Sequence, residues 1–217
     1  IEEAEIRGDG SSFSFTTPHR THHNLHIPLL GEHQVENASL AVAAADRLDA
    51  DGVFSIPADA IKSGLLKTRW PGRGELLNRR PLFMIDGAHT DQGATAVSNM
   101  LDRLYPGKRR VMILGMNRDK DIHKFLRSFA TKPNIVLATQ ADSPRAISSA
   151  ELKQMVEEHS MECVSVDMQD TIPLALKLAG EDGLIVGTGS FYVIGALRHL
   201  WLREFNTNST LQHSIEE

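Results

Sequence analysis

The chain has 217 residues, of which 41% are hydrophobic and 24% charged, a composition typical of a globular protein and not of a disordered one. With 23 Lys and Arg against 28 Asp and Glu, the net charge is −5, so no basic excess exists for binding nucleic acid or an anionic membrane surface. A single cysteine, Cys163, excludes an intrachain disulfide framework, and without a long apolar run or signal pattern we expect a cytoplasmic protein with no membrane contact.

The first 70 residues carry few predicted elements. A strand is expected at 12–15, and helices are expected at about 34–48 and 57–66. The first helix has a face of small residues that needs a close partner, which this segment offers too few strands to supply. Because the chain also begins with Ile1 and not with methionine, we expect residues 1–70 to be the tail of a larger domain in a trimmed or truncated chain.

A polar stretch between the predicted strand and the first helix carries four histidines. These are His19, His22, His23 and His26. Their spacing matches no usual metal-ligand pattern, so we expect solvated surface side chains. The sequence therefore predicts no metal site.

A linker is predicted where Pro71, Gly72 and Gly74 interrupt the helical pattern, over residues 71–80. From about Pro81 to residue 206, short apolar runs alternate with amphipathic segments, and residues 207–217 are a polar tail. The predicted strands lie at 82–85, 110–114, 134–138, 163–166 and 184–186. The predicted helices lie at about 94–104, 122–129, 148–156, 170–179 and 191–205. This alternation is typical of an α/β fold, a Rossmann-like and mostly parallel sheet flanked by helices.

Polar residues follow four of these strands. In such a sheet the ligand lies beyond the carboxyl ends of the strands, so the loops should gather chemically useful side chains around one crevice. They are Asp86, His89, Lys120, Asp121, Arg145 and Ser190. The mixture suits a ligand with carboxylates, an amine or phosphates, although each loop taken alone could be polar only because it is solvated.

Known nucleotide motifs are incomplete. Gly187 and Gly189 stand between a strand and a helix, but a dinucleotide fingerprint needs a third glycine and an acidic residue about 20 positions later. No phosphate-binding loop of the G-x-x-x-x-G-K-[ST] type occurs either. If ATP binds, its triphosphate is therefore held mostly elsewhere. Cys163, at a strand start, reads as a buried small residue and not as a nucleophile.

Three stretches together resemble a known family. Residues 29–38 (LLGEHQVENA), 69–75 (RWPGRGE) and 85–89 (IDGAH) look like the folylpolyglutamate synthase/dihydrofolate synthase branch of the Mur ligase superfamily. Shorter motifs at 119–121, 143–145 and 189–192 fall in the same order. The resemblance covers nearly the whole chain but only the second half of a family member. It implies that residues 1–70 end the central ATPase domain and that residues 81–206 form the carboxyl-terminal domain.

The resemblance implies an ATP-dependent ligase that adds L-glutamate to the carboxylate of a folate or of dihydropteroate through an acyl phosphate. ATP, Mg²⁺, folate and glutamate would be its ligands, and a monomer is expected. The family's phosphate loop, its magnesium ligands and its carbamylated lysine have no counterpart in these residues. The chain alone is therefore expected to be inactive.

By motif, Asn37 would hydrogen-bond the adenine, Arg73 would reach the nucleotide, and Asp86 would accept hydrogen bonds from the ribose. The resemblance assigns the incoming glutamate to three residues, His89, Lys120 and Ser190. His89 is also a candidate general base.

One position departs from the family pattern, since Thr90 stands where the family has asparagine. Threonine keeps a hydroxyl but lacks the paired donor and acceptor of an amide, so its contact must be made differently. Two other functions stay open. One is another Mur-type amino-acid ligase, such as one for cell-wall peptide precursors, and the other is a non-catalytic binding module.

Overall fold

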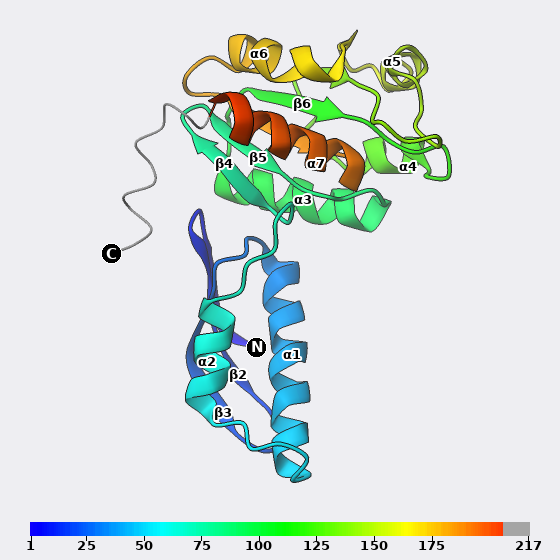
Figure 1. Ribbon diagram of the computed structural model, residues 1–217. Helices are drawn as coiled ribbons and strands as arrows, with labels where there is room; N and C mark the ends of the chain where they lie inside the picture. Colours follow the sequence, from blue (N-terminus) through cyan, green and yellow to red (C-terminus); the bar gives the residue numbers. More distant parts are fainter. Residues whose placement is uncertain (206–217) are drawn as a thin grey trace.

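The computed structural model describes residues 1–205 in two lobes joined by a short linker (Figure 1). The smaller lobe contains a three-stranded antiparallel sheet and two helices. Its elements are β1 (Glu2–Arg7), β2 (Gly10–Thr16), β3 (Thr21–Ile27), α1 (Glu32–Ala50) and α2 (Ala58–Leu66). Val35, Ala38 and Val42 of α1 are buried in one cluster with Phe13 and Leu25 of the sheet. This contact gives the small-residue face of α1 its partner.

The expectation of too few strands in this lobe is therefore wrong. β1 and β3 were not predicted because neither strand shows a clear alternation of apolar and polar residues. In β1, Ile6 is the only buried residue. In β3 one of the three inward positions is a histidine, His22.

The histidines are also not all solvated. His22 is only 4% exposed and its Nε2 lies 2.9 Å from Oδ2 of Asp46, whereas His19 and His23 are exposed. Asp46 also accepts hydrogen bonds from Thr17 Oγ1 (2.7 Å) and Arg20 Nε (2.8 Å). A buried carboxylate is tolerated when it is paired and fully hydrogen-bonded, so this cluster ties β3 to α1.

The larger lobe is built on a six-stranded sheet in the order β4-β5-β9-β6-β7-β8. The strands are β4 (Glu75–Arg79), β5 (Leu82–Ile85), β6 (Arg110–Leu114), β7 (Ile135–Ala138), β8 (Cys163–Ser165) and β9 (Leu184–Thr188). All are parallel except β4, which runs antiparallel to β5. The α/β fold class and all five predicted strands are confirmed. The prediction of a linker over 71–80 is wrong in its second half, because residues 75–79 form an edge strand with half-buried side chains and an irregular register.

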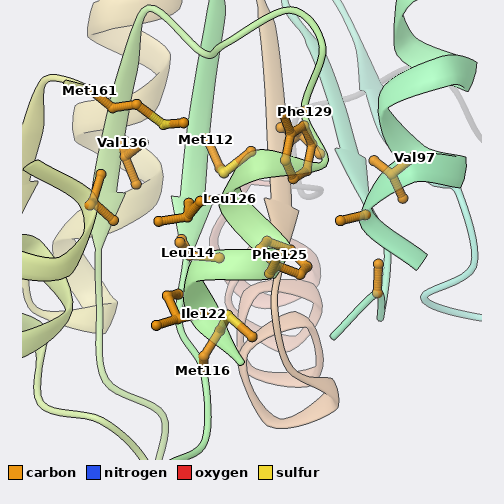
Figure 2. Packing of buried hydrophobic residues seen from close by; sticks show 14 of the residues in the cluster. Val97, Met112, Leu114, Met116, Ile122, Phe125, Leu126, Phe129, Val136 and Met161 are labelled. Carbon is orange, nitrogen blue, oxygen red and sulfur yellow. The ribbon is translucent and has the colours of Figure 1, made fainter. Parts of the chain in front are cut away.

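Helices cover both faces of this sheet. They are α3 (Asp91–Leu104), α4 (Ile122–Arg127), α5 (Ser149–Glu157), α6 (Met168–Ala179) and α7 (Phe191–Leu200), followed by a π-helical turn at Trp201–Phe205. One hydrophobic cluster joins α3, α4 and α5 to the sheet, where Met112 and Leu114 face Phe125 and Leu126 (Figure 2). The cluster on the other face contains residues of α6 and α7.

Three helix predictions need correction. α6 begins at Met168, slightly earlier than expected, and Pro173 is its sixth residue. α4 ends at Arg127, although Phe129 beyond it is buried. The last helix is α-helical only to Leu200. The predicted tail at 207–217, with residue 206, lies outside the described residues.

The two lobes touch beside the linker. Leu30, which precedes α1, is buried in the hydrophobic cluster of the larger lobe. The side chains of Glu32 on α1 and Arg103 on α3 form an ion pair across the boundary. Within residues 1–205 no helix is long and apolar enough to span a bilayer.

Candidate functional site

A pocket of about 190 Å³ lies at the carboxyl ends of the parallel strands. Four predicted residues line it together, and they follow four different strands: His89 after β5, Lys120 after β6, Arg145 after β7 and Ser190 after β9. Parallel strands end at one edge of a sheet, so loops far apart in the sequence meet there. The predicted convergence of these four side chains is present in the structure.

His89 is oriented by its own loop. Its Nδ1 lies 2.8 Å from the carbonyl oxygen of Gly87, and because a carbonyl can only accept, Nδ1 carries the proton of this hydrogen bond. In the neutral ring Nε2 is then an acceptor. The ring also packs edge-on against Phe191, with the centroids 5.7 Å apart.

Ser190 is the N-cap of α7. Its Oγ accepts a hydrogen bond from the backbone N–H of Tyr192 at 3.2 Å, and the residue is only 4% exposed. Gly189, just before it, has φ of +100°, and a Cβ there would lie 2.7 Å from the carbonyl oxygen of Gly115. Glycine is the residue that adopts this conformation without strain. The Gly-x-Gly sequence therefore serves the turn that places Ser190 in the pocket.

Lys120 belongs to a charged group on the pocket wall. Its Nζ lies 3.2 Å from Asp119 Oδ2, and Arg145 Nη1 lies 3.9 Å from Asp119 Oδ1. The hydrogen bond from Lys120 lowers the pKa of Asp119. Asp121, which we expected in the same crevice, instead caps α4 by accepting a hydrogen bond from Lys124 N, and it does not line the pocket.

Asp86 lies at the end of β5, buried to 3% exposure. Its Oδ2 accepts a hydrogen bond from Gly74 N and its Oδ1 one from Ala88 N, each at 2.8 Å. Burial raises the pKa of Asp86, while these two backbone donors and the charges of Arg73 and His33 oppose the rise. Each oxygen uses one of its two acceptor positions, so both can accept a further hydrogen bond. Asp86 does not line the 190 Å³ pocket.

Arg73 lies in the linker close to Asp86. Its guanidinium stacks on two aromatic rings, at 5.5 Å from the centroid of Trp70 and 5.4 Å from that of Phe191. Within residues 1–205 it forms no ion pair with a carboxylate. Arg73 also lines a cavity of about 420 Å³ at the linker. A half-buried cation without a carboxylate partner suits an anionic ligand such as a phosphate.

Asn37 is separate from the pocket. It is exposed on α1, and its Nδ2 donates only to Gln34 Oε1 at 3.3 Å. His33, about one helical turn away, is close enough to Asp86 for their charges to interact, and burial lowers its pKa. The structure thus places four predicted residues in one pocket, Asp86 and Arg73 beside it, and Asn37 farther along α1.

Sequence analysis missed the role of Phe191. Its ring contacts both Arg73 and His89, and a Cβ added to Gly87 would lie 2.5 Å from it. The ring therefore bridges the linker and the pocket. The sequence feature that could have indicated this role is the position of Phe191, an aromatic residue directly after a helix N-cap that itself follows a strand.

Thr90 has a clear local role. Its Oγ1 accepts a hydrogen bond from Gly93 N at 3.2 Å and caps α3. Both threonine and asparagine are preferred N-cap residues, so the departure from the family pattern preserves the start of this helix. No group of three or more acidic, histidine or cysteine side chains within residues 1–205 is arranged to hold a metal ion.

Comparison with known proteins gives the family. The model of the Mur ligase glutamate ligase domain matches residues 72–191. The chain belongs to the Mur ligase family. Among curated proteins it is 29% identical to the dihydrofolate synthase/folylpolyglutamate synthase of Bacillus subtilis, over 87% of this chain and 44% of that protein. It is 25% identical to the folylpolyglutamate synthase of Lacticaseibacillus casei, over 93% of this chain and 46% of that protein.

Solved structures agree with this assignment. A Mycobacterium tuberculosis folylpolyglutamate synthase complexed with ADP and AMPPCP superposes with a TM-score of 0.81 at 27% identity. The match covers 93% of this chain and 47% of that one. The chain thus spans less than half the length of these relatives.

Proposed function

We propose that the protein containing this chain is an ATP-dependent ligase that joins L-glutamate to the carboxylate of a folate or of dihydropteroate. The observation that carries the proposal is the meeting of His89, Lys120 and Ser190 in one small pocket beside Arg73 and Asp86. Membership of the Mur ligase family and relatives named as folylpolyglutamate or dihydrofolate synthases support it.

In the proposed reaction, ATP supplies a phosphoryl group that turns the folate carboxylate into an acyl phosphate, a better acceptor for an amine. The amine of glutamate attacks the carbonyl carbon, a C–N bond forms, and the C–O bond to phosphate breaks. The amine must lose a proton. His89 is our candidate base, because Nδ1–H is bound to Gly87 and Nε2 is left as an acceptor.

Lys120 and Ser190 would hold the glutamate. Lys120 provides a positive charge for a carboxylate, and the hydroxyl proton of Ser190 is free to donate because Oγ is the acceptor in its cap hydrogen bond. A pocket of about 190 Å³ is smaller than the roughly 300–1,000 Å³ of a site for a drug-sized ligand, and so it fits an amino acid better than a nucleotide.

The nucleotide would be held at the linker, where Arg73 forms no ion pair within residues 1–205 and the oxygens of Asp86 can each accept one more hydrogen bond. Arg73 would contact phosphate, Asp86 the ribose hydroxyls and Asn37 the adenine. The described residues offer no metal ligand set, so we propose that Mg²⁺ accompanying the nucleotide is bound by other parts of the protein. We also propose that residues 1–70 end a central ATP-binding domain, that the linker extends only to residue 74, and that the chain alone is inactive.

The test is a turnover assay of the whole gene product that contains this chain. The protein, with ATP, Mg²⁺, L-glutamate and either tetrahydrofolate or dihydropteroate, should give a product heavier by one glutamate residue in mass spectrometry. A cell-wall peptide precursor offered in place of the folate should give none. Folded protein that binds ATP but ligates no folate would contradict the proposal.

A further inference from the structure

One face of α7 contacts the turn of the linker that carries Arg73. The residues of this face are Phe191, Ile194 and Arg198, and side chains spaced by three and four positions lie on the same side of a helix. Phe191 packs against the guanidinium of Arg73, at 5.4 Å from the ring centroid. Ile194 lies so close to Gly72 that a Cβ added to this glycine would be 2.6 Å from Cδ1 of Ile194. The helix therefore supports the turn from one side.

Glu75, the first residue of β4, joins the same helix to the turn. Its Oε2 accepts hydrogen bonds from Gly72 N at 2.8 Å and from Arg198 Nε at 3.0 Å, and its Oε1 lies 2.9 Å from the same Nε. Hydrogen bonds between charged groups are roughly twice as strong as those between neutral groups. Because Glu75 also pairs with Ile85 in the sheet, its carboxylate connects the linker, β4 and α7 at one point.

Arg73 lies between two glycines whose N–H groups both donate to carboxylates of the larger lobe. Gly72 N donates to Glu75 and Gly74 N donates to Asp86, each at 2.8 Å. The backbone on both sides of Arg73 is thus fixed relative to β4 and β5. The guanidinium then reaches the rings on which it stacks from a defined starting point.

Glu75 also affects the charge of the linker cavity. Four arginines line this cavity of about 420 Å³, and they are Arg69, Arg73, Arg79 and Arg198. Glu75 pairs with Arg198, whereas Arg73 forms no ion pair within residues 1–205. Without the carboxylate of Glu75, Arg198 would compete with Arg73 for an anion that enters the cavity.

We propose that Glu75, held by Arg198, is a positioning residue that sets the place of Arg73 for nucleotide binding. The inference rests on the proposed function, in which Arg73 contacts phosphate, and adds the ion pair through which that contact is prepared. The groups assigned to the glutamate and to proton transfer lie in the other pocket. Loss of the pair should therefore weaken nucleotide binding more than it slows the steps that follow binding.

The first measurement needs no substrate. In NMR spectra of the ¹⁵N-labelled 217-residue chain, the Nε–H resonance of Arg73 should be shifted by the ring currents of the two aromatic side chains on which the guanidinium stacks. Glu75→Gln keeps the length of the side chain but removes the charge that holds Arg198, and Arg198→Gln removes the same pair from the other side. In each variant the Arg73 resonance should move toward that of an exposed arginine.

The second measurement uses turnover by the gene product, with ATP varied at saturating glutamate and folate. Glu75→Gln and Arg198→Gln should each raise the KM for ATP about 10-fold, the loss expected for a hydrogen bond to a charged group, and should change kcat less than about threefold. The double variant should resemble either single variant, because both substitutions remove one interaction. Arg198→Lys keeps the positive charge and should restore part of the loss.

Glu181→Gln is the matched control. It removes the acid of an exposed ion pair with Arg80, at 3.0 Å, in the same lobe, and it should change neither the Arg73 resonance nor the two kinetic constants.

Two results would overturn the inference. One is an Arg73 resonance that stays unchanged in both single variants, and the other is an unchanged KM for ATP in variants of a gene product that ligates folate. In either case ligation by the wild-type protein would leave the proposed function standing. Conversely, a wild-type gene product without ligation, together with a displaced Arg73 resonance in both variants, would remove the proposed reaction and leave Glu75 as the residue that positions Arg73.

Discussion

Each lobe buries one aspartate whose pKa is shifted, and the two shifts have opposite directions. Asp46 in the smaller lobe is 1% exposed and Asp86 in the larger lobe is 3% exposed. Burial disfavours the charge of Asp46, but hydrogen bonds from Thr17 and His22 and the charges of His22 and Arg20 outweigh it, so its pKa is lowered. Burial dominates at Asp86, whose hydrogen-bond donors are two backbone N–H groups, and its pKa is raised.

We propose that this difference separates a structural carboxylate, Asp46, from a functional one, Asp86. Asp46 has cationic partners within its own lobe, and its charge is neutralised there. Asp86 has no ion pair within residues 1–205, as we would expect of a carboxylate with the proposed contact to the ribose. Buried carboxylates whose pKa is raised by desolvation are candidates for functional sites. The predictions below test whether the two carboxylates can be separated experimentally.

The largest effect is expected at Asp46. Asp46→Ala leaves Arg20 and His22 facing each other without their shared acceptor, and removing one partner of a buried ion pair costs about 3–5 kcal/mol. Urea unfolding of the chain, followed by circular dichroism, measures the loss. The control is Asp51→Ala, whose exposed pair with Arg47 is worth about 0.3–0.5 kcal/mol. Equal losses in the two variants would show that the cluster adds nothing to stability.

Asp86→Asn should act on catalysis more than on folding. An amide cannot accept hydrogen bonds at both of its ends, so one of the Gly74 and Ala88 N–H groups loses its acceptor, at a cost of about 1–3 kcal/mol. Ligation by the gene product should fall about 100-fold, as expected when an oriented polar contact in the site is lost. Near-normal turnover in a folded Asp86→Asn protein would remove Asp86 from the site.

The same two residues give opposite dependences of stability on pH. The lowered pKa of Asp46 means that the unfolded chain binds the proton more readily than the folded one. The contribution of Asp46 to the free energy of unfolding is therefore present above the unfolded pKa near 3.8 and is lost as the pH falls through the folded pKa. The raised pKa of Asp86 has the reverse sign: its contribution is fully present below 3.8 and is lost as the pH rises through the folded pKa.

These slopes can be measured by urea unfolding between pH 3 and 6. Relative to wild type, Asp46→Asn should lose stability less steeply as the pH falls, and Asp86→Asn should lose stability less steeply as the pH rises. Identical slopes in the two variants would contradict the contrast between the lobes.

The smallest effect is expected at the ring that joins the linker to the pocket. Phe191→Leu keeps an apolar side chain but removes the face on which Arg73 stacks, an interaction worth about 0.5–1 kcal/mol at exposed sites. Ligation should therefore fall about two- to fivefold with little change in melting temperature. Leu202→Ala, a change at another exposed apolar residue of the larger lobe, is the control, and an equal loss there would show that the effect of Phe191→Leu is not specific.

The sequence predicted the larger lobe better than the smaller one for physical reasons. Strands such as 110–114 are buried on both faces, and continuous apolar runs bounded by loops identify them. β3 presents polar residues outward and a histidine inward, so no such run exists. β4 was missed because the glycine-rich residues directly before it are typical of a linker. The strand forms because residues 75–79 pair with β5.

The site was predicted in part. Topology alone places the loops after β5, β6, β7 and β9 together. The predicted positions of His89, Lys120, Arg145 and Ser190 followed from it. Asp121 was assigned wrongly, because a residue that ends a loop can instead cap the next helix. The pairing of His22 with Asp46, 24 residues apart, and the bridging position of Phe191 depend on tertiary contacts that no local pattern encodes.

The hydrogen bond from Gly74 to Asp86 has a consequence for motion between the lobes. Rotation about residues 72–74 must break that bond or carry β5 along, and Glu75 also accepts a hydrogen bond from Gly72 N while it pairs with Arg198 on α7. These hydrogen bonds therefore restrain residues 72–74, and the linker is not a freely rotating segment. A ligand that displaced Gly74 N from Asp86 Oδ2 would loosen the attachment of residues 72–74 to β5.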